Sequence, residues 1–191
     1  MNREIQKIID DLSKHLSGKR LRHSIGVMYT AGCLAMRYGA SADDAYLAGI
    51  LHDCAKEYDN DKLISICRKN KLGMTEYEMS NPFLLHGKVG AYVAEKKYGV
   101  KSPDILGPII FHTTGRAGMT LPEQILFVAD YIEPNRKKID GLEHIRHTAF
   151  IDIDKTCALI IDNCLKYLNG KGCVDMGADT LETYEYYKKF L

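Results

Sequence analysis

The residues of this 191-residue sequence that could do chemistry are histidines and aspartates placed beside apolar helical stretches. The doublet His52-Asp53 ends one such stretch, and His23, His86, His112 and Asp130 lie on other expected helices. A single histidine in such a position is more often a hydrogen-bonded core or surface residue than a metal ligand. Burying several imidazoles and carboxylates around one core is costly unless they are paired or bound to a metal. A bound cation is the simplest way to make the cluster tolerable.

The types of donor atom restrict the choice of metal ion but do not identify it. Adjacent helical residues point about 100° apart, so His52 and Asp53 can ligate one ion only where the helix ends or is distorted. The loss of the apolar period after Cys54 fits that requirement. Imidazole nitrogen with carboxylate oxygen suits iron, manganese, nickel or zinc better than magnesium or calcium. The number of ions, one or two, stays open.

Composition excludes several classes of protein. The 26 Lys+Arg nearly cancel the 25 Asp+Glu, so no overall field attracts nucleic acid or an anionic membrane. No apolar run approaches the roughly 20 residues of a membrane span. The N-terminus MNREIQKIIDDL is acidic where a signal peptide is apolar, so we expect a cytoplasmic protein. The six cysteines form no C-x-x-C pair and are interpreted as buried reduced thiols.

Apolar residues at helical spacing, together with capping signals, predict an all-α fold. Polar residues 74–81 are expected to separate two helices, and no segment alternates long enough to be a strand. With no linker, we expect a single domain, 1–191, forming a helical bundle of about ten helices. The expected helices span about residues 2–16, 17–39, 41–53, 60–70, 82–98, 102–110, 120–130, 141–149, 153–168 and 179–190.

Two cationic side chains lie at helical spacing from the aspartate and histidine positions. Lys56 follows Asp53 by three residues, and Arg20 precedes His23 by three, so each can reach a phosphate held at the cluster. Without the cluster, Lys56 would be interpreted as an exposed lysine. The glycine-containing loop 170–177 either approaches a nucleotide or is a plain connector.

These residues match a family pattern. His23, the doublet His52-Asp53 and Asp130 resemble the metal-binding signature of the HD-domain phosphohydrolase superfamily, which is all-helical. The strings LRHSIGV, GILHDCAKEY, LLHGKVGA, FHTTG and FVADYIEPNR are similar to those of YqeK-type HD hydrolases. That resemblance implies a single HD domain that splits diadenosine tetraphosphate into two ADP molecules at an iron-containing site. Manganese, cobalt or another divalent transition metal remains an alternative to iron.

The resemblance also implies roles for individual residues. The expected metal ligands are His23, His52, Asp53 and Asp130. The expected catalytic residues are Asp53, Lys56, His86 and His112. Whether His86 and His112 bind metal or phosphate stays open. The expected substrate contacts are Arg20, Asp53, Cys54, Ala55, Lys56, His86, His112, Thr113, Asp130, Arg136, Cys173, Val174, Asp175 and Met176.

Three other functions remain as alternatives. Another HD hydrolase could act on guanosine polyphosphates, deoxynucleotides or cyclic nucleotides, and a nucleotide sensor could bind without turnover. A nucleic-acid binder fits poorly, because the basic cluster at residues 136–138 is short and lacks interleaved aromatic residues. The tyrosines of the C-terminal helix are expected to pack on the chain itself or across a homodimer.

Overall fold

The computed structural model describes residues 3–136, 139–172 and 176–191, and these form helices and connecting turns with no strand. The all-α prediction is confirmed, and the described residues contain eleven α-helices where about ten were expected. In chain order the elements are α1 (Arg3–Leu12), α2 (Gly18–Tyr38), α3 (Ala42–Leu51), α4 (Asn60–Asn70), α5 (Glu76–Ser80), η1 (Pro82–Leu85), α6 (His86–Tyr98), α7 (Pro103–Phe111), α8 (Leu121–Ile132), α9 (Leu142–Thr148), α10 (Ile153–Gly170), α11 (Ala178–Tyr187) and η2 (Lys188–Phe190).

Local sequence signals set the ends of the central helices. The Ser17 hydroxyl accepts a hydrogen bond from the backbone N–H of Arg20 and so caps α2 at its start. Gly39 ends α2 in the left-handed conformation, with φ of 74°, which glycine adopts without strain. Thr120 and Glu123 form a capping box at the start of α8, as the sequence predicted. These signals fix the register of the two helices that carry His23 and Asp130.

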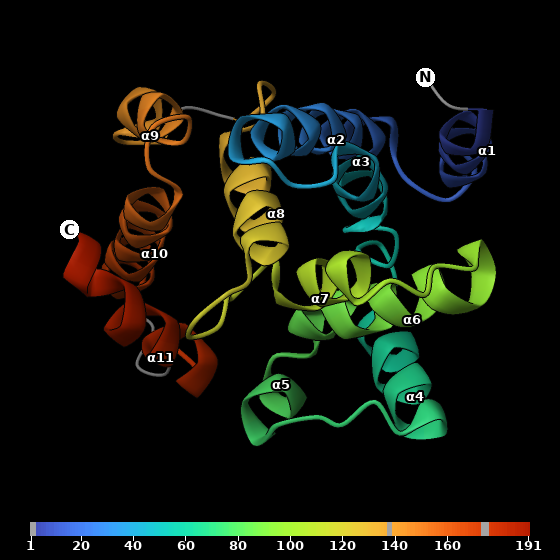
Figure 1. Ribbon diagram of the computed structural model, residues 1–191. Helices are drawn as coiled ribbons and strands as arrows, with labels where there is room; N and C mark the ends of the chain where they lie inside the picture. The colour runs from blue at the N-terminus through green and yellow to red at the C-terminus, as the bar shows by residue number, and fades with distance from the viewer. Residues whose placement is uncertain (1–2, 137–138, 173–175) are drawn as a thin grey trace.

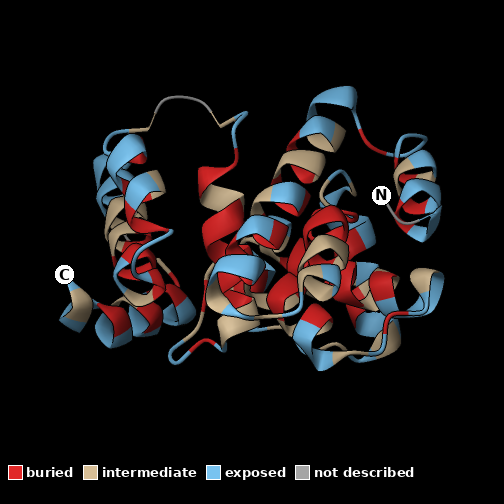
Figure 2. Ribbon diagram, turned by 45° about the horizontal axis from the view of Figure 1, so that its top comes forward, coloured by how far each residue is buried: buried red, intermediate tan, exposed pale blue. Residues whose placement is uncertain are grey.

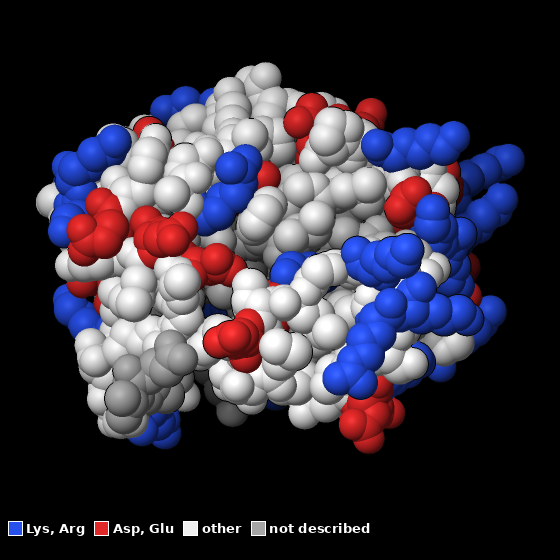
Figure 3. Space-filling view, turned by 90° about the horizontal axis from the view of Figure 1, so that it is seen from below, with Lys and Arg blue, Asp and Glu red and all other residues white. Residues whose placement is uncertain are grey.

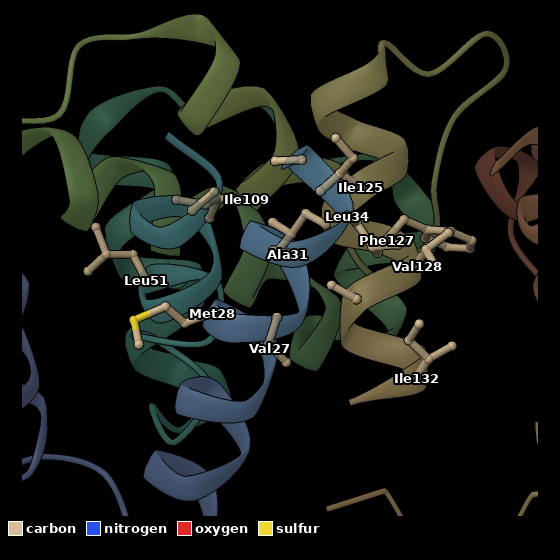
Figure 4. Close-up of a cluster of buried hydrophobic side chains, with 14 of the residues drawn as sticks. Val27, Met28, Ala31, Leu34, Leu51, Ile109, Ile125, Phe127, Val128 and Ile132 are labelled. Atoms are coloured by element: carbon tan, nitrogen blue, oxygen red, sulfur yellow. The ribbon is translucent and has the colours of Figure 1, made fainter. Parts of the chain in front are cut away.

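Helices α2, α3, α7 and α8 enclose the central core (Figures 1 and 4). Figure 4 shows their apolar side chains directed toward one another, among them Val27, Met28, Leu51, Ile109 and Ile125. Across the molecule, buried residues occupy the helix faces turned inward, whereas the outward faces are exposed (Figure 2). Burial of these faces is the main force holding the helices together.

The remaining helices flank this core. In Figure 1, α10 and α11 lie on one side of α8, and α4 to α6 lie below α3. Tyr187 at the end of α11 is fully buried and its hydroxyl oxygen accepts a hydrogen bond from Gln124 of α8. The C-terminal tyrosines therefore include one that packs on the chain itself, which is one of the two arrangements expected.

Some sequence predictions were wrong in detail. Residues 76–80 form α5, because Thr75 and Glu78 make a capping box that the sequence analysis overlooked. The single helix expected over 82–98 is divided, with a 3₁₀ turn before α6 begins at His86. The first helix ends at Leu12 rather than near residue 16. Cys33 is exposed, so the prediction of buried thiols fails there.

Charge is less evenly distributed than the sequence indicated. Figure 3 shows Lys and Arg side chains gathered on the side of the molecule where α4 and α6 pack together. The last turns of these two helices are basic, with Arg68 and Lys69 in α4 and Lys96 and Lys97 in α6. Folding thus produces a local basic surface from a nearly neutral chain. Among the described residues, no helix is both long and apolar enough to cross a membrane.

Candidate metal and phosphate site

Six side chains from five helices converge on one buried point. The contributors are His23 of α2, His52 and Asp53 directly after α3, His86 at the start of α6, His112 directly after α7 and Asp130 of α8. All four imidazoles and Asp53 are buried. The structure thus brings together every residue that the sequence assigned to metal, as well as the two histidines whose ligand was left open.

Carboxylate oxygens lie between the imidazoles. His23 Nε2 is 2.9 Å from Asp130 Oδ1, and His52 Nε2 is 3.3 Å from Asp53 Oδ2. The other Asp53 oxygen, Oδ1, lies 3.4 Å from His86 Nε2 and 3.6 Å from His112 Nε2. The helix α3 ends at Leu51, so His52 and Asp53 can point to the same place, as the sequence argument required.

Every imidazole turns the same nitrogen inward. Nδ1 of His52, His86 and His112 faces a backbone carbonyl oxygen, and Nδ1 of His23 faces the Glu133 carboxylate. Because these oxygens only accept, each Nδ1 carries a proton, and Nε2 is the ring atom that faces the cluster. Nε2 of His86 and Nε2 of His112 lie 3.0 Å apart. Such an arrangement needs a cation or a donated proton between the rings.

The donor set fits a metal ion. His23, His52 and Asp130 form one group whose donor atoms lie within 4.8 Å of one another, and His52, Asp53 and His112 form a second. Among the described side chains, His23 Nε2, His52 Nε2 and Asp53 Oδ1 are buried without a well-formed hydrogen bond. Buried polar atoms without partners are costly, and a cation would satisfy all three. The nitrogen and oxygen donors suit a divalent transition metal.

Electrostatics favours ionised carboxylates but acts differently on two of the histidines. Burial would lower the pKa of His52, yet Asp53 raises it above its usual value. Burial, reinforced by His112 and Lys56, lowers the pKa of His86 to about 3. Burial would raise the pKa of Asp53, but His52 and His112 hold it well below its usual range. Burial acts likewise on Asp130, yet Arg136 and His23 keep its pKa low. Both carboxylates are therefore anionic at neutral pH and available as ligands.

Three cations surround the cluster. Arg20 Nη1 donates to Asp53 Oδ2 at 2.6 Å, and Arg136 Nη2 donates to Asp130 Oδ1 at 2.7 Å. Lys56 Nζ lies 3.1 Å from His86 Nε2, and burial lowers the pKa of this lysine. All three therefore contact the cluster directly, and Lys56 is not the exposed lysine of the alternative interpretation.

Two adjoining cavities open beside the cluster. One, of about 330 Å³, is lined by polar residues of the cluster, by Arg20, Lys56 and Arg136, and by several apolar side chains. The other, of about 490 Å³, is mainly apolar and aromatic, and its wall includes Tyr77, Phe83, Tyr131, Tyr167 and Met176. The cavities share Thr113, Tyr131, Arg136, Ile139 and Cys164. A ligand with a polyanionic part and an aromatic part matches this pair of cavities.

The other expected substrate contacts fall into three groups. Thr113 Oγ1 lies 3.2 Å from His86 Nε2 and 3.1 Å from His112 Nε2, so it borders the cluster. The side chains of Cys54 and Ala55 do not converge there; Cys54 Sγ contacts the carbonyl oxygen of Gly90, and Ala55 packs in a separate small core. Residues 173–175 lie outside the described residues.

Sequence reasoning missed Glu133. This carboxylate is 1% exposed, and its Oε1 lies 3.0 Å from His23 Nδ1. It stands three residues after Asp130 within the string FVADYIEPNR, immediately beyond the end of α8. A charged residue in an otherwise apolar stretch was the available signal, but its partner lies 110 residues away.

Known proteins share this fold and sequence. The HD domain family model matches residues 20–135. A symmetrical bis(5′-nucleosyl)-tetraphosphatase from Halalkalibacterium halodurans is 40% identical, covering 93% of this chain and 94% of that protein. Its Bacillus subtilis counterpart is 38% identical, covering 97% of each. A crystal structure from Clostridium acetobutylicum, described as a predicted HD superfamily hydrolase involved in NAD metabolism, superposes with a TM-score of 0.92 at 38% identity over 96% of each chain. The chain belongs to the HD-domain family and, within it, to the family of the symmetrical bis(5′-nucleosyl)-tetraphosphatases.

Proposed function

We propose that this protein is a metal-dependent hydrolase that splits diadenosine tetraphosphate at its central anhydride into two ADP molecules. The observation that carries the proposal is the buried convergence of four imidazoles and two carboxylates beside three cations and two cavities. The relatives named for this activity align with nearly the whole chain, which supports the same substrate here.

The residues that would hold the metal are His23, His52, Asp53 and Asp130, with His112 within reach of a second ion. A divalent metal bound there would activate water for attack near neutral pH and offset the negative charge of the phosphates. We favour iron because the resemblance to the YqeK-type hydrolases implies it. Imidazole and carboxylate donors suit manganese, cobalt or another divalent transition metal as well.

Side chains of the site neutralise the phosphates, orient the attacking water and donate a proton. Arg20 and Arg136 can turn from their carboxylate partners toward the phosphate oxygens and so neutralise the tetraphosphate. Asp53 orients the attacking water, which adds to one central phosphorus as the bridging oxygen departs with the other ADP. Lys56 donates a proton toward that departing phosphate, because its ammonium lies at the cluster and its pKa is lowered by burial. His86 and His112 either bind metal or contact phosphate.

The two cavities explain how one half of the substrate would be held. The polar cavity accepts the phosphates, and the aromatic cavity accepts the adenosine, stacked near Tyr131 or Tyr167. Thr113 lies where the cavities meet and can donate to a phosphate oxygen. Met176 lines the aromatic cavity, consistent with its expected role as a substrate contact.

Product analysis tests the proposal. The protein is reconstituted separately with iron, manganese, cobalt and zinc, incubated with diadenosine tetraphosphate, and its products are separated by chromatography. ADP as the sole product is expected. AMP with ATP would contradict central cleavage, and consumption of another nucleotide alone would favour a different HD hydrolase.

Two variants connect the activity to the site. The substitution His52→Ala should abolish ADP formation, because it removes an imidazole shared by both potential metal groups. The matched control His144→Ala changes an exposed histidine on α9 and should leave the rate unchanged. Retained hydrolysis in the His52 variant under defined metal concentrations would refute the site assignment.

A further inference from the structure

The four site histidines do not all find their Nδ1 acceptor in the same way. Three of them donate to the carbonyl oxygen three residues earlier, at the end of a helix or 3₁₀ turn where such carbonyls lack a helical partner. These bonds are His52 to Gly49 at 2.7 Å, His86 to Phe83 at 2.6 Å and His112 to Ile109 at 2.8 Å. Their orientation is thus provided by local backbone geometry.

The Nδ1 atom of His23 has no free backbone carbonyl oxygen of this kind to donate to. It lies within α2, which continues to Tyr38, so nearby backbone carbonyls are engaged in the helix. Its Nδ1 instead meets Glu133 Oε1 at 3.0 Å, across 110 residues of sequence. A side chain from another part of the chain therefore performs for His23 what the backbone performs for the other three histidines.

The structure holds Glu133 in place from several sides. Its Oε2 accepts hydrogen bonds from the backbone N–H of Asn135 at 2.7 Å and from Asn135 Nδ2 at 3.0 Å. Arg146 donates to the carbonyl oxygens of Ile132 and Glu133 at 2.9 and 3.0 Å. With its backbone and one oxygen both fixed, the carboxylate presents its other oxygen to His23 in a defined direction.

The facing surface of α2 is shaped to accept this carboxylate. A Cβ atom placed on Gly26 would lie 2.3 Å from Glu133 Oε2 and 3.1 Å from Asn135 Nδ2. Real Cβ atoms do not approach other atoms so closely, so any larger residue at position 26 would displace Glu133. Gly26 is one helical turn after His23, which places the cleared space directly beside the imidazole.

We propose that Glu133 is a positioning residue for the metal: it fixes the His23 ring with Nε2 directed into the cluster, toward Asp130 and His52, and it increases the basicity of that nitrogen. Carboxylates bonded to the far nitrogen of a metal-binding histidine have this effect in other metal sites. This inference rests on the proposed function only through its metal site. It assigns a role to a residue that is 1% exposed and reaches the cluster through His23.

The test measures metal affinity rather than turnover. The substitution Glu133→Gln retains the size of the side chain and removes its charge. We expect the affinity for Co²⁺ or Mn²⁺, measured by competition with a chromophoric chelator, to fall about tenfold or more. The visible spectrum of bound Co²⁺ should also change, because the His23 ring is no longer held in one orientation. Glu95→Gln, which alters an exposed glutamate on α6, is the matched control and should bind as the wild type does.

A second variant separates positioning from folding. Gly26→Ala leaves Glu133 chemically intact but displaces it, so it should weaken metal binding in the same direction. Circular dichroism of each metal-free variant establishes that it is folded before the titration. Wild-type affinity and spectrum in folded Glu133→Gln would overturn the inference while leaving the proposed function intact. A wild-type protein that binds no divalent metal would overturn both.

Discussion

Gly49 links the packing of the core to the geometry of the site, and Gly49→Ala tests that link. Gly49 lies in the last turn of α3, against the backbone of α2. A Cβ atom there would be 2.6 Å from Met28 Cα and 2.9 Å from Met28 N. Carbon atoms pack at about 3.5 to 4.0 Å, so α3 would have to move about 1 Å away from α2. Backbone atoms cannot rotate aside as a flexible side chain can.

The magnitude follows from two opposed terms. Overpacking a well-filled core costs about 1 to 3 kcal/mol, and a clash with backbone atoms belongs to the upper part of that range, about 2 to 3 kcal/mol. Alanine is favoured over glycine in a helix by about 1 kcal/mol, which offsets part of this cost. The expected net loss in the free energy of unfolding is therefore about 1 to 2 kcal/mol. At roughly 2 to 4 °C per kcal/mol for a chain of this size, the melting temperature should fall by about 2 to 8 °C.

The Gly49→Ala substitution should reduce metal affinity and kcat more than it reduces the free energy of unfolding. The same movement separates His23 on α2 from His52 and Asp53 at the end of α3, and Gly49 also supplies the carbonyl that orients His52. We expect weaker metal binding and a lower kcat even where the variant remains fully folded, because displacements near 1 Å at a site can reduce rates about 100-fold.

Urea unfolding of the metal-free protein and metal titration of the folded protein measure the two effects separately. Gly18→Ala is the matched control, since a Cβ atom there meets nothing within 4 Å at the start of α2. Wild-type stability and metal affinity in the Gly49 variant would refute the argument that the α2–α3 contact sets the site.

Two further predictions concern Lys56 and the contact between α1 and α6. Lys56→Met should lower kcat about 100-fold while metal affinity does not decrease, because the ammonium serves as proton donor beside His86 and is not a ligand; an unchanged kcat in steady-state assays would exclude that role. Hydrogen bonds from Lys97 and Tyr98 lower the pKa of Asp11 in the folded protein. The contact therefore stabilises the fold fully at pH values above the unfolded-state pKa of about 4. This stabilisation is lost as the pH falls through the lower folded-state pKa. Asp11→Asn should accordingly reduce the melting temperature at pH 7, and the difference from wild type should shrink below about pH 4; a difference that persists at pH 2 would contradict this.

The sequence was sufficient to predict the residues of the cluster, but not the residue that positions one of its histidines. His23, His52-Asp53 and Asp130 were recognisable because each interrupts an apolar helical stretch and because their order matches a family signature. Helix ends were predictable where a capping residue is local, as at Ser17 and Thr120. Glu133 was missed because its role depends on a partner that only the tertiary fold brings near.

Other features were missed for the same reason. Lys69 lies in the last turn of α4 and Lys97 in the last turn of α6, and these two helices pack together only in the folded chain. No run of charges in the sequence indicates a basic surface shared by the two helices. Helix α5, by contrast, was readable: Thr75 and Glu78 form a capping box, but the polar composition of the segment concealed its five-residue helix. Local signals were thus available for helices, whereas contacts between distant segments were not.

Helix ends explain why this site can be built from so few special residues. His52 and His112 each follow the last residue of a helix, where backbone carbonyls are free to accept from Nδ1 and where consecutive side chains are no longer held 100° apart. One structural circumstance therefore orients the imidazole and also lets Asp53 join His52 at the same point. His23 lies where neither advantage exists, and it is the histidine that a distant carboxylate supports. The need for Glu133 follows from the position of His23 in its helix, so a variant that loses this carboxylate should lose the ordering of one ring and leave the other three in place.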